Sequence, residues 1–83
     1  MKRYKSKTWQ LETTGTEGNA TLFGVNIFDY EWRSTGQRME VTDPVYGQKH
    51  LFSIYRVLIE DKEYEFACGE FSNCVYGFYV QKY

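Results

Sequence analysis

Residues 49–59, KHLFSIYRVLI, are the longest run of strand-forming side chains in this sequence. One face of an extended backbone carries Phe52, Ile54 and Leu58 here, with Arg56 between the last two. The opposite face carries Leu51, Tyr55, Val57 and Ile59. A strand that is apolar on both faces is typical of the middle of a sheet, or of a sheet covered on both sides. The stretch therefore predicts a central β-strand.

Shorter strand-like runs lie on both sides of it, separated by clusters of Gly, Asn, Asp and Ser. Strands are expected at 3–12, 20–28, 38–42, 62–68 and 74–83. Loops and turns are expected at 13–19, 33–37, 43–47, 60–62 and 69–73. The alternation changes phase near Asn26–Phe28, which indicates a β-bulge or a bend. A short helical turn over 29–34 is the alternative.

The connections between these runs are short, which favours antiparallel pairing, because parallel neighbours need about a dozen linking residues or more. Eighty-three residues suffice for one domain, and a chain that is 42% hydrophobic and 19% aromatic has the apolar side chains for a small core. We expect a single all-β domain over residues 1–83. Its architecture is expected to be a meander of about five or six antiparallel strands, curled into a small barrel or a compact sandwich.

Charge is nearly balanced over the whole chain, with a net charge of −1. A general nucleic-acid binder is usually basic, because neutralising phosphates supplies most of its affinity. The distribution is uneven, since four of the ten basic residues lie within positions 1–7 and five of the eleven acidic ones within 60–70. We expect two oppositely charged solvated edges, with a basic binding arm as the alternative.

The stretch MKRYKSKTWQLE is charged but lacks the apolar segment of a secretory signal. No run approaches the ~18 apolar residues of a membrane-spanning helix. We therefore expect a soluble, cytoplasmic protein that does not associate with membranes.

Two cysteines, Cys68 and Cys74, would lie opposite each other if residues 69–73 formed a five-residue hairpin loop. Two cysteines and one histidine do not supply the four ligands of a structural zinc site, and a redox pair needs Cys-x-x-Cys at a helix N-terminus. A cross-strand disulfide fits the expected geometry, but a reducing compartment favours free thiols. We expect free thiols packed in the core, and neither metal nor cofactor.

Residues suited to catalysis do not form a recognisable pattern. His50 is the single histidine and is expected at the surface. The glycines of TGTEGN lack the ending of a phosphate-binding loop. Five carboxylates alternate with apolar residues, which indicates a solvated face rather than an acid–base pair. They are Asp29, Glu31, Glu63, Glu65 and Glu70. We expect a protein that is not an enzyme.

An aromatic stripe occurs within NIFDYEWR, residues 26–33, where Phe28, Tyr30 and Trp32 share one face of a strand beside Arg33. The stripe is either core-facing or an exposed patch for a partner, since Trp, Tyr and Arg dominate interface hot spots. We predict a non-enzymatic interaction or accessory module. Its partner is expected to be another protein, or a second copy bound through a sheet edge.

Single-stranded nucleic acid is the alternative partner, bound on a small barrel. The residues that support it are Lys2, Arg3, Lys5, Lys7 and Trp9, which combine positive charge with a ring on which a base can stack. This hypothesis requires the charges and the ring to converge on one face. It fails if the acidic segment around Glu63 and Glu65 covers them.

Overall fold

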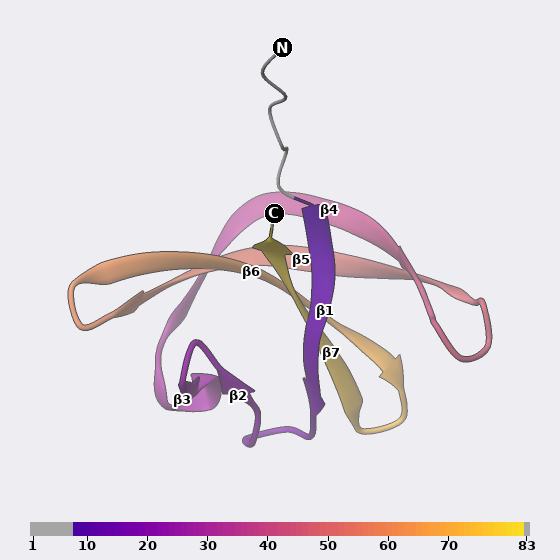
Figure 1. Ribbon diagram of the computed structural model, residues 1–83, viewed down its shortest axis with the longest axis horizontal. Helices are drawn as coiled ribbons and strands as arrows, with labels where there is room; N and C mark the ends of the chain where they lie inside the picture. Colours follow the sequence, from indigo (N-terminus) through magenta and orange to yellow (C-terminus); the bar gives the residue numbers. More distant parts are fainter. Residues whose placement is uncertain (1–7, 83) are drawn as a thin grey trace, which may run out of the picture.

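The computed structural model of the protein describes residues 8–82 and shows an all-β, antiparallel fold. The strands are β1 (Thr8–Gly15), β2 (Thr21–Leu22), β3 (Val25–Asn26), β4 (Trp32–Thr42), β5 (Lys49–Ile59), β6 (Lys62–Ser72) and β7 (Val75–Lys82), and one 3₁₀ turn, η1, spans Ile27–Asp29. Five strands form a sheet in the order β1-β7-β6-β5-β4, and β2 and β3 form a separate hairpin (Figure 1). The predicted fold class is therefore confirmed, with β1 and β4 as the edges of the main sheet.

The central position predicted for residues 49–59 is also confirmed, because β5 lies between β4 and β6. Its two faces contribute to different cores. Val57 and Ile59 are buried on one face, while Phe52 and Ile54 are buried on the other. An 11-residue strand is about 36 Å long. This length allows one end of β5 to pack in one core and the other end in the second core.

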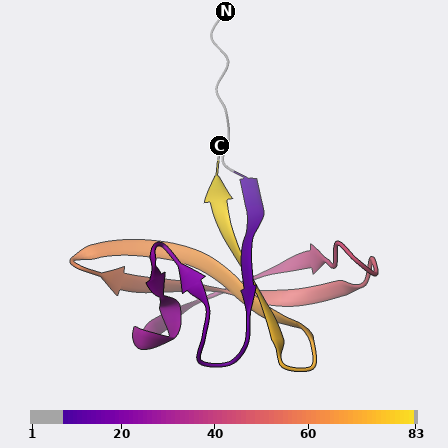
Figure 2. The ribbon, with the colours of Figure 1, turned by 60° about the horizontal axis from the view of Figure 1, so that its bottom comes forward.

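The first core lies beneath the β2–β3 hairpin and η1, which cover one face of the sheet (Figure 2). Its buried side chains are Ala20, Leu22, Ile27, Val57, Ile59, Phe66, Cys68, Phe78 and Val80. The second core consists of Val41, Phe52, Ile54 and Ala67, with Trp9, Met39, Phe71 and Tyr79 packed against it. Each face of β5 is thus buried over only part of its length. Leu51 and Leu58, expected on apolar faces, are consequently exposed.

The hairpin over the first core is held in place by Asn26. Its Oδ1 accepts hydrogen bonds from the backbone N–H groups of Ala20 (3.3 Å) and Phe28 (3.2 Å), and its Nδ2 donates to the Gly18 carbonyl (3.2 Å). The amide therefore connects the 16–19 loop to the start of η1. This explains the phase change predicted near residues 26–28, because the chain bends there into a 3₁₀ turn.

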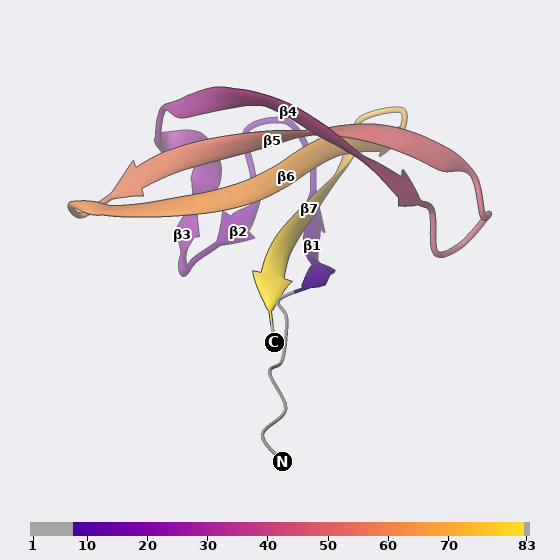
Figure 3. The same cartoon turned by 90° about the horizontal axis from the view of Figure 1, so that it is seen from above.

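Two glycines allow the sheet to pack closely in the second core. A Cβ atom on Gly69 would lie 2.3 Å from the Phe52 ring, and one on Gly77 would lie 2.3 Å from the Phe71 ring. The two glycines are cross-strand neighbours, so both rings pack closely against backbone that carries no side chain. The central strands also cross one another with a pronounced twist when seen from above (Figure 3).

Three predicted boundaries within residues 8–37 are wrong. The loop expected at 13–19 begins later, because β1 continues to Gly15. Residues 20–28 are not one strand but the tight β2–β3 hairpin followed by η1, and no helical turn occupies 29–34. Residues 33–37 are not a turn but part of β4. Three residues at 35–37 stand opposite Ile54 alone, and the Thr35 hydroxyl donates to the Ile54 carbonyl (2.8 Å). Gly36, with φ of +80°, sits in this wide bulge.

The loop predicted at 69–73 is also wrong, because β6 continues to Ser72 and the turn is at Asn73–Cys74. Cys68 therefore pairs with Phe78 across the strands rather than with Cys74. Both thiols are free, as expected, but only Cys68 is buried in the core, and Cys74 is exposed. The cross-strand disulfide considered from the sequence does not form.

Candidate functional site

An apolar groove lies between the 43–48 turn and the β1 and β7 strands. Of the six large hydrophobic side chains that residues 8–82 expose, four line it: Leu11, Val45, Tyr46 and Val75. Val45 is 75% exposed and Tyr46 80% exposed. The groove has a volume of about 560 Å³, within the roughly 300–1,000 Å³ typical of ligand pockets. Exposed apolar side chains gathered in one concave place are typical of a binding surface.

One rim of the groove is a turn organised by Asp43, whose side chain is buried. Asp43 Oδ1 accepts hydrogen bonds from the backbone N–H groups of Val45 (2.7 Å) and Tyr46 (3.3 Å). The backbone closes the same turn, since the Gly47 N–H donates to the Asp43 carbonyl (2.9 Å) and the Asp43 N–H donates to the Gln48 carbonyl (2.7 Å). The two apolar side chains are therefore presented from a fixed backbone.

His50 packs against this turn on the side of Asp43. Its Nε2 lies 3.8 Å from Asp43 Oδ2, is buried, and has no hydrogen-bond partner among the described residues. Its ring packs edge-on against Phe71 at 5.5 Å between centroids. The prediction of a surface histidine is therefore wrong, because the ring is half-buried between the turn and the sheet.

The opposite rim is β1, and its geometry depends on a bulge. Leu11 pairs with Tyr79, and Thr14 pairs with Gly77. Leu11 and Thr14 are three positions apart on β1, whereas Tyr79 and Gly77 are only two positions apart on β7. The extra residue at Glu12 places Leu11 and Thr14 on the same face of the sheet, where both line the groove. Without the bulge these side chains would point to opposite faces.

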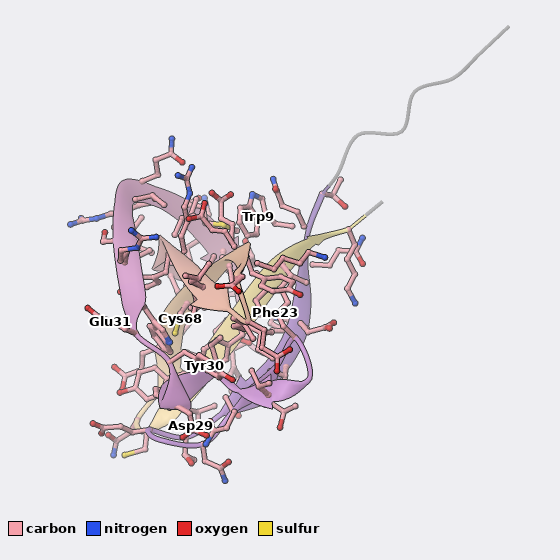
Figure 4. The ribbon with its side chains drawn as sticks, turned by 90° about the vertical axis from the view of Figure 1, so that its left-hand side faces the viewer. Trp9, Phe23, Asp29, Tyr30, Glu31 and Cys68 are labelled. Carbon is pink, nitrogen blue, oxygen red and sulfur yellow. The ribbon has the colours of Figure 1, made fainter. Side chains whose placement is uncertain are left out.

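The aromatic residues predicted as an interaction patch lie at the margin of the first core. Phe28, Tyr30 and Trp32 are half-buried against it. The Trp32 ring lies 5.0 Å from the Phe28 ring, and its Nε1–H donates to the Ile27 carbonyl at 2.8 Å. Figure 4 shows Tyr30 directed inward, whereas its neighbours Asp29 and Glu31 point outward. The three rings thus contribute to the packing of the first core.

Arg33 is exposed and forms an ion pair with Glu63 at 3.3 Å. Arg56 and Glu65 form a second pair at 3.3 Å on the neighbouring strands. The structure does not bring Arg33 together with the three rings, because successive side chains of β4 point to opposite faces.

The residues proposed for nucleic-acid binding are not assembled in the described part of the chain. Lys2, Arg3, Lys5 and Lys7 lie outside the described residues, and Trp9 is half-buried against the second core. With four of the ten basic residues beyond it, the described chain carries six Lys and Arg against eleven Asp and Glu.

The buried Cys68 and the half-buried Tyr79 have raised pKa values. Burial raises the pKa of the Cys68 thiol to about 12. Burial also raises the pKa of Tyr79, and the Asp43 carboxylate raises it further. Among residues 8–82, no three His, Cys, Asp or Glu side chains come together in a way that would hold a metal ion.

The groove was missed by the sequence reasoning. The segment DPVYG was correctly predicted as a turn, and its two large apolar residues, Val45 and Tyr46, were the available signal. Such side chains are unusual at a turn that faces solvent. The contribution of β1 had no comparable signal, because it depends on a bulge.

Comparisons with protein-family models, with curated proteins and with solved structures found no match to this chain. Within residues 8–82 there is no helix long and apolar enough to cross a membrane.

Proposed function

We propose that this protein is a small, non-enzymatic interaction module that binds another protein through the groove between β1 and the 43–48 turn. The observation that carries the proposal is the convergence of Leu11, Val45, Tyr46 and Val75 on one concave surface. Leaving four large apolar side chains in contact with water is unfavourable, and a partner that covers them recovers that free energy.

The rigidity of the rim supports the same proposal. Asp43 fixes the backbone of Val45 and Tyr46 through two hydrogen bonds, so little conformational entropy remains to be lost when a partner binds. Tyr46 adds a large ring with a polar hydroxyl, a side chain enriched at interface hot spots.

A cytoplasmic location is part of the proposal. Cys74 is an exposed thiol, and Cys68 is buried at a position that does not face it. Exposed free thiols persist in reducing compartments, whereas oxidising compartments favour their pairing.

The test compares three full-length chains in affinity capture from an extract of the cells that produce the protein. The groove variant carries Val45→Ser and Tyr46→Ser, and the matched control carries Leu51→Ser and Leu58→Ser, which replace exposed apolar residues outside the groove. A partner retained by the native chain and the control, lost by the groove variant, and bound again after purification is the expected result. Equal retention by all three chains would contradict the proposal.

Single-stranded nucleic acid remains the alternative partner, and the excess of acidic side chains in the described chain opposes it. An amide NMR titration with a mixed-sequence oligonucleotide at low and then moderate salt decides the question. Salt-sensitive shifts confined to residues 2–9 and neighbouring rings would favour nucleic acid. Absence of shifts at low salt, where electrostatic attraction is strongest, would exclude it.

A further inference from the structure

In the part of the chain that the structure describes, the main sheet has two free edges, β1 and β4, and they differ in how well they are protected. The β4 edge contains the wide bulge at 35–37 and three charged side chains, Arg33, Arg38 and Glu40. Bulges and charges are the usual means by which proteins prevent strand addition. β1 also has a bulge, but a smaller one with a single extra residue at Glu12. Its one charged residue is this Glu12, which is paired with Lys82 of the neighbouring β7. The less protected edge is therefore β1.

The β1 edge adjoins the groove directly. Leu11 and Thr14 form one rim, and no strand within residues 8–82 pairs with the outer side of β1. Every second residue of a strand added there would lie on the same face as these two side chains. Such a residue would stand beside Leu11 and face Val45 and Tyr46 across the groove. Main-chain pairing and side-chain insertion would thus occur together.

The charge around this end of the sheet is negative. Desolvation raises the pKa of Tyr76, and the nearby carboxylates of Glu70 and Glu17 raise it further. Tyr76 pairs with Gly15 at the end of β1 and lies on the first-core face, opposite the groove, toward which the alternate side chains of an added strand would point. Neither Glu17 nor Glu70 has an ion pair with another described residue, while the described chain as a whole carries eleven acidic and six basic side chains. A positively charged occupant is complementary to this surface.

We propose that the occupant is an extended, positively charged peptide segment of a partner protein. It adds to the outer edge of β1 as a further strand and places an apolar side chain in the groove between Leu11 and Val45. This inference rests on the proposed function and specifies the partner's chemistry. A groove of about 560 Å³ accommodates a few side chains, whereas a folded second copy needs an extended complementary surface.

The experiment uses the full-length protein and three synthetic peptides of eight residues with blocked ends. The first alternates lysine with valine, the second alternates glutamate with valine, and the third is the lysine peptide with methylated backbone nitrogens on alternate residues. The third keeps charge and side chains but loses the donors needed for strand pairing. Binding is measured by amide chemical shifts, and strand addition by hydrogen exchange of the β1 amides.

The expected result is that the lysine peptide binds at least about tenfold more tightly than either other peptide. Binding of the lysine peptide slows hydrogen exchange of the outward-facing amides in β1. The peptide binds more weakly to the Val45→Ser, Tyr46→Ser variant. Equal binding of the methylated peptide would overturn strand addition, and equal binding of the glutamate peptide would overturn the charge requirement. No protection of β1 at millimolar peptide would overturn the inference as a whole.

Sedimentation of the protein alone completes the test. Concentration-dependent dimers that disappear in the groove variant would assign the groove to a second copy and overturn the inference. If affinity capture yields a groove-dependent partner while the lysine peptide fails to bind, the proposed function stands and the inference about peptide chemistry falls. If neither is found, both fail.

Discussion

At the scale of single residues, Asp43 has the largest influence on the groove. It is a buried carboxylate that accepts hydrogen bonds from two backbone N–H groups and faces His50. Removing such an acceptor leaves two partly buried donors without a partner in the protein, which costs more than the bond itself contributes. The turn and the exposure of its two apolar side chains therefore depend on one side chain.

Asp43→Ala is expected to lower the free energy of unfolding by about 1–3 kcal/mol, because the N–H groups of Val45 and Tyr46 lose their acceptor. Asp43→Asn keeps an oxygen in the same place and is expected to retain most of that stability. Urea unfolding followed by circular dichroism measures both. Equal losses in the two variants would show that the interaction with His50, rather than the backbone, is what Asp43 contributes.

The two thiols are expected to differ in reactivity. Cys74 is exposed, while Cys68 is buried with a pKa raised to about 12, so it stays protonated at pH 8. A thiol reagent such as Ellman's reagent should react with one thiol in the native protein and with two in urea. Cys74→Ser should abolish the native reaction, and a fast reaction that survives this substitution would contradict the burial of Cys68.

Stability is expected to fall in alkaline solution. In the unfolded chain Cys68 loses its proton near its ordinary pKa of 9.0, whereas in the folded protein it keeps the proton up to about 12. The unfolded state therefore binds fewer protons between these values, and the free energy of unfolding decreases as pH rises through them. Tyr79, whose pKa is also raised, acts in the same direction. Denaturant midpoints at pH 8, 9, 10 and 11 measure how stability changes with pH. In the Cys68→Ala variant, stability should fall less steeply as pH rises.

At the scale of elements, the β5–β6 turn is strained. Glu60 has φ of 49° and Asp61 φ of 67°, both in the left-handed region. A two-residue hairpin with positive φ at both positions favours Asn followed by Gly. The local sequence therefore fits this turn poorly, although the turn connects the central strand β6 to its inner neighbour β5.

The double substitution Glu60→Asn, Asp61→Gly is expected to raise the free energy of unfolding by about 1 kcal/mol, because it relieves left-handed strain. Thermal and urea unfolding give the value. The matched control is Asn73→Asp, a change of charge in the next hairpin turn at a residue without positive φ. A decrease in stability of the double variant would mean that the Glu60 and Asp61 side chains stabilise the turn by contacts of their own.

The elements also show what the sequence predicts and what it does not. The alternation in residues 49–59 predicts β5 and its central place, because burial on both faces leaves a local pattern. The length of β6 is not predicted, because Gly69 resembles a loop residue, whereas its missing Cβ makes room for the Phe52 ring. Gly36 also resembles a turn residue, but it lies in a bulge of β4 opposite Ile54. In both cases the deciding neighbour is distant in sequence.

The groove itself is a property that local patterns do not encode. Val45 and Tyr46 give a signal in the turn, but Leu11 and Thr14 reach the same face only through the bulge at Glu12. Phe28, Tyr30 and Trp32 all pack against the first core, but they do not form one face of a strand, because Phe28 lies in η1 and only Trp32 belongs to a strand. Whether they also contact a partner stays a prediction.

At the scale of the whole molecule, two cores share the strands β5, β6 and β7. Each contains or contacts one tryptophan: Trp32 lies against the first core and Trp9 against the second. Because the shared strands cannot leave one core without disturbing the other, the two are expected to unfold together. A single domain, as predicted from the sequence, requires the two cores to unfold together in this way.

Single-tryptophan variants test it. Trp9→Phe leaves fluorescence only from the first core, and Trp32→Phe leaves it only from the second. In each variant, the urea midpoint from fluorescence is expected to coincide with the midpoint from far-ultraviolet circular dichroism, as in two-state unfolding. Separate midpoints within one variant would show that the two cores are independent units.

The two cores lie on opposite faces of β5. This arrangement also determines which insertions and deletions the protein tolerates during evolution. Ile54 and Val57 face opposite sides of β5 because three positions separate them. Deleting one residue between them would turn both toward the same side, and one core would lose its strand. Insertions and deletions within β5 are therefore tolerated only when they add or remove an even number of residues. The 16–19 loop has no such constraint. Among divergent copies of this gene, the length of β5 should vary less than its composition.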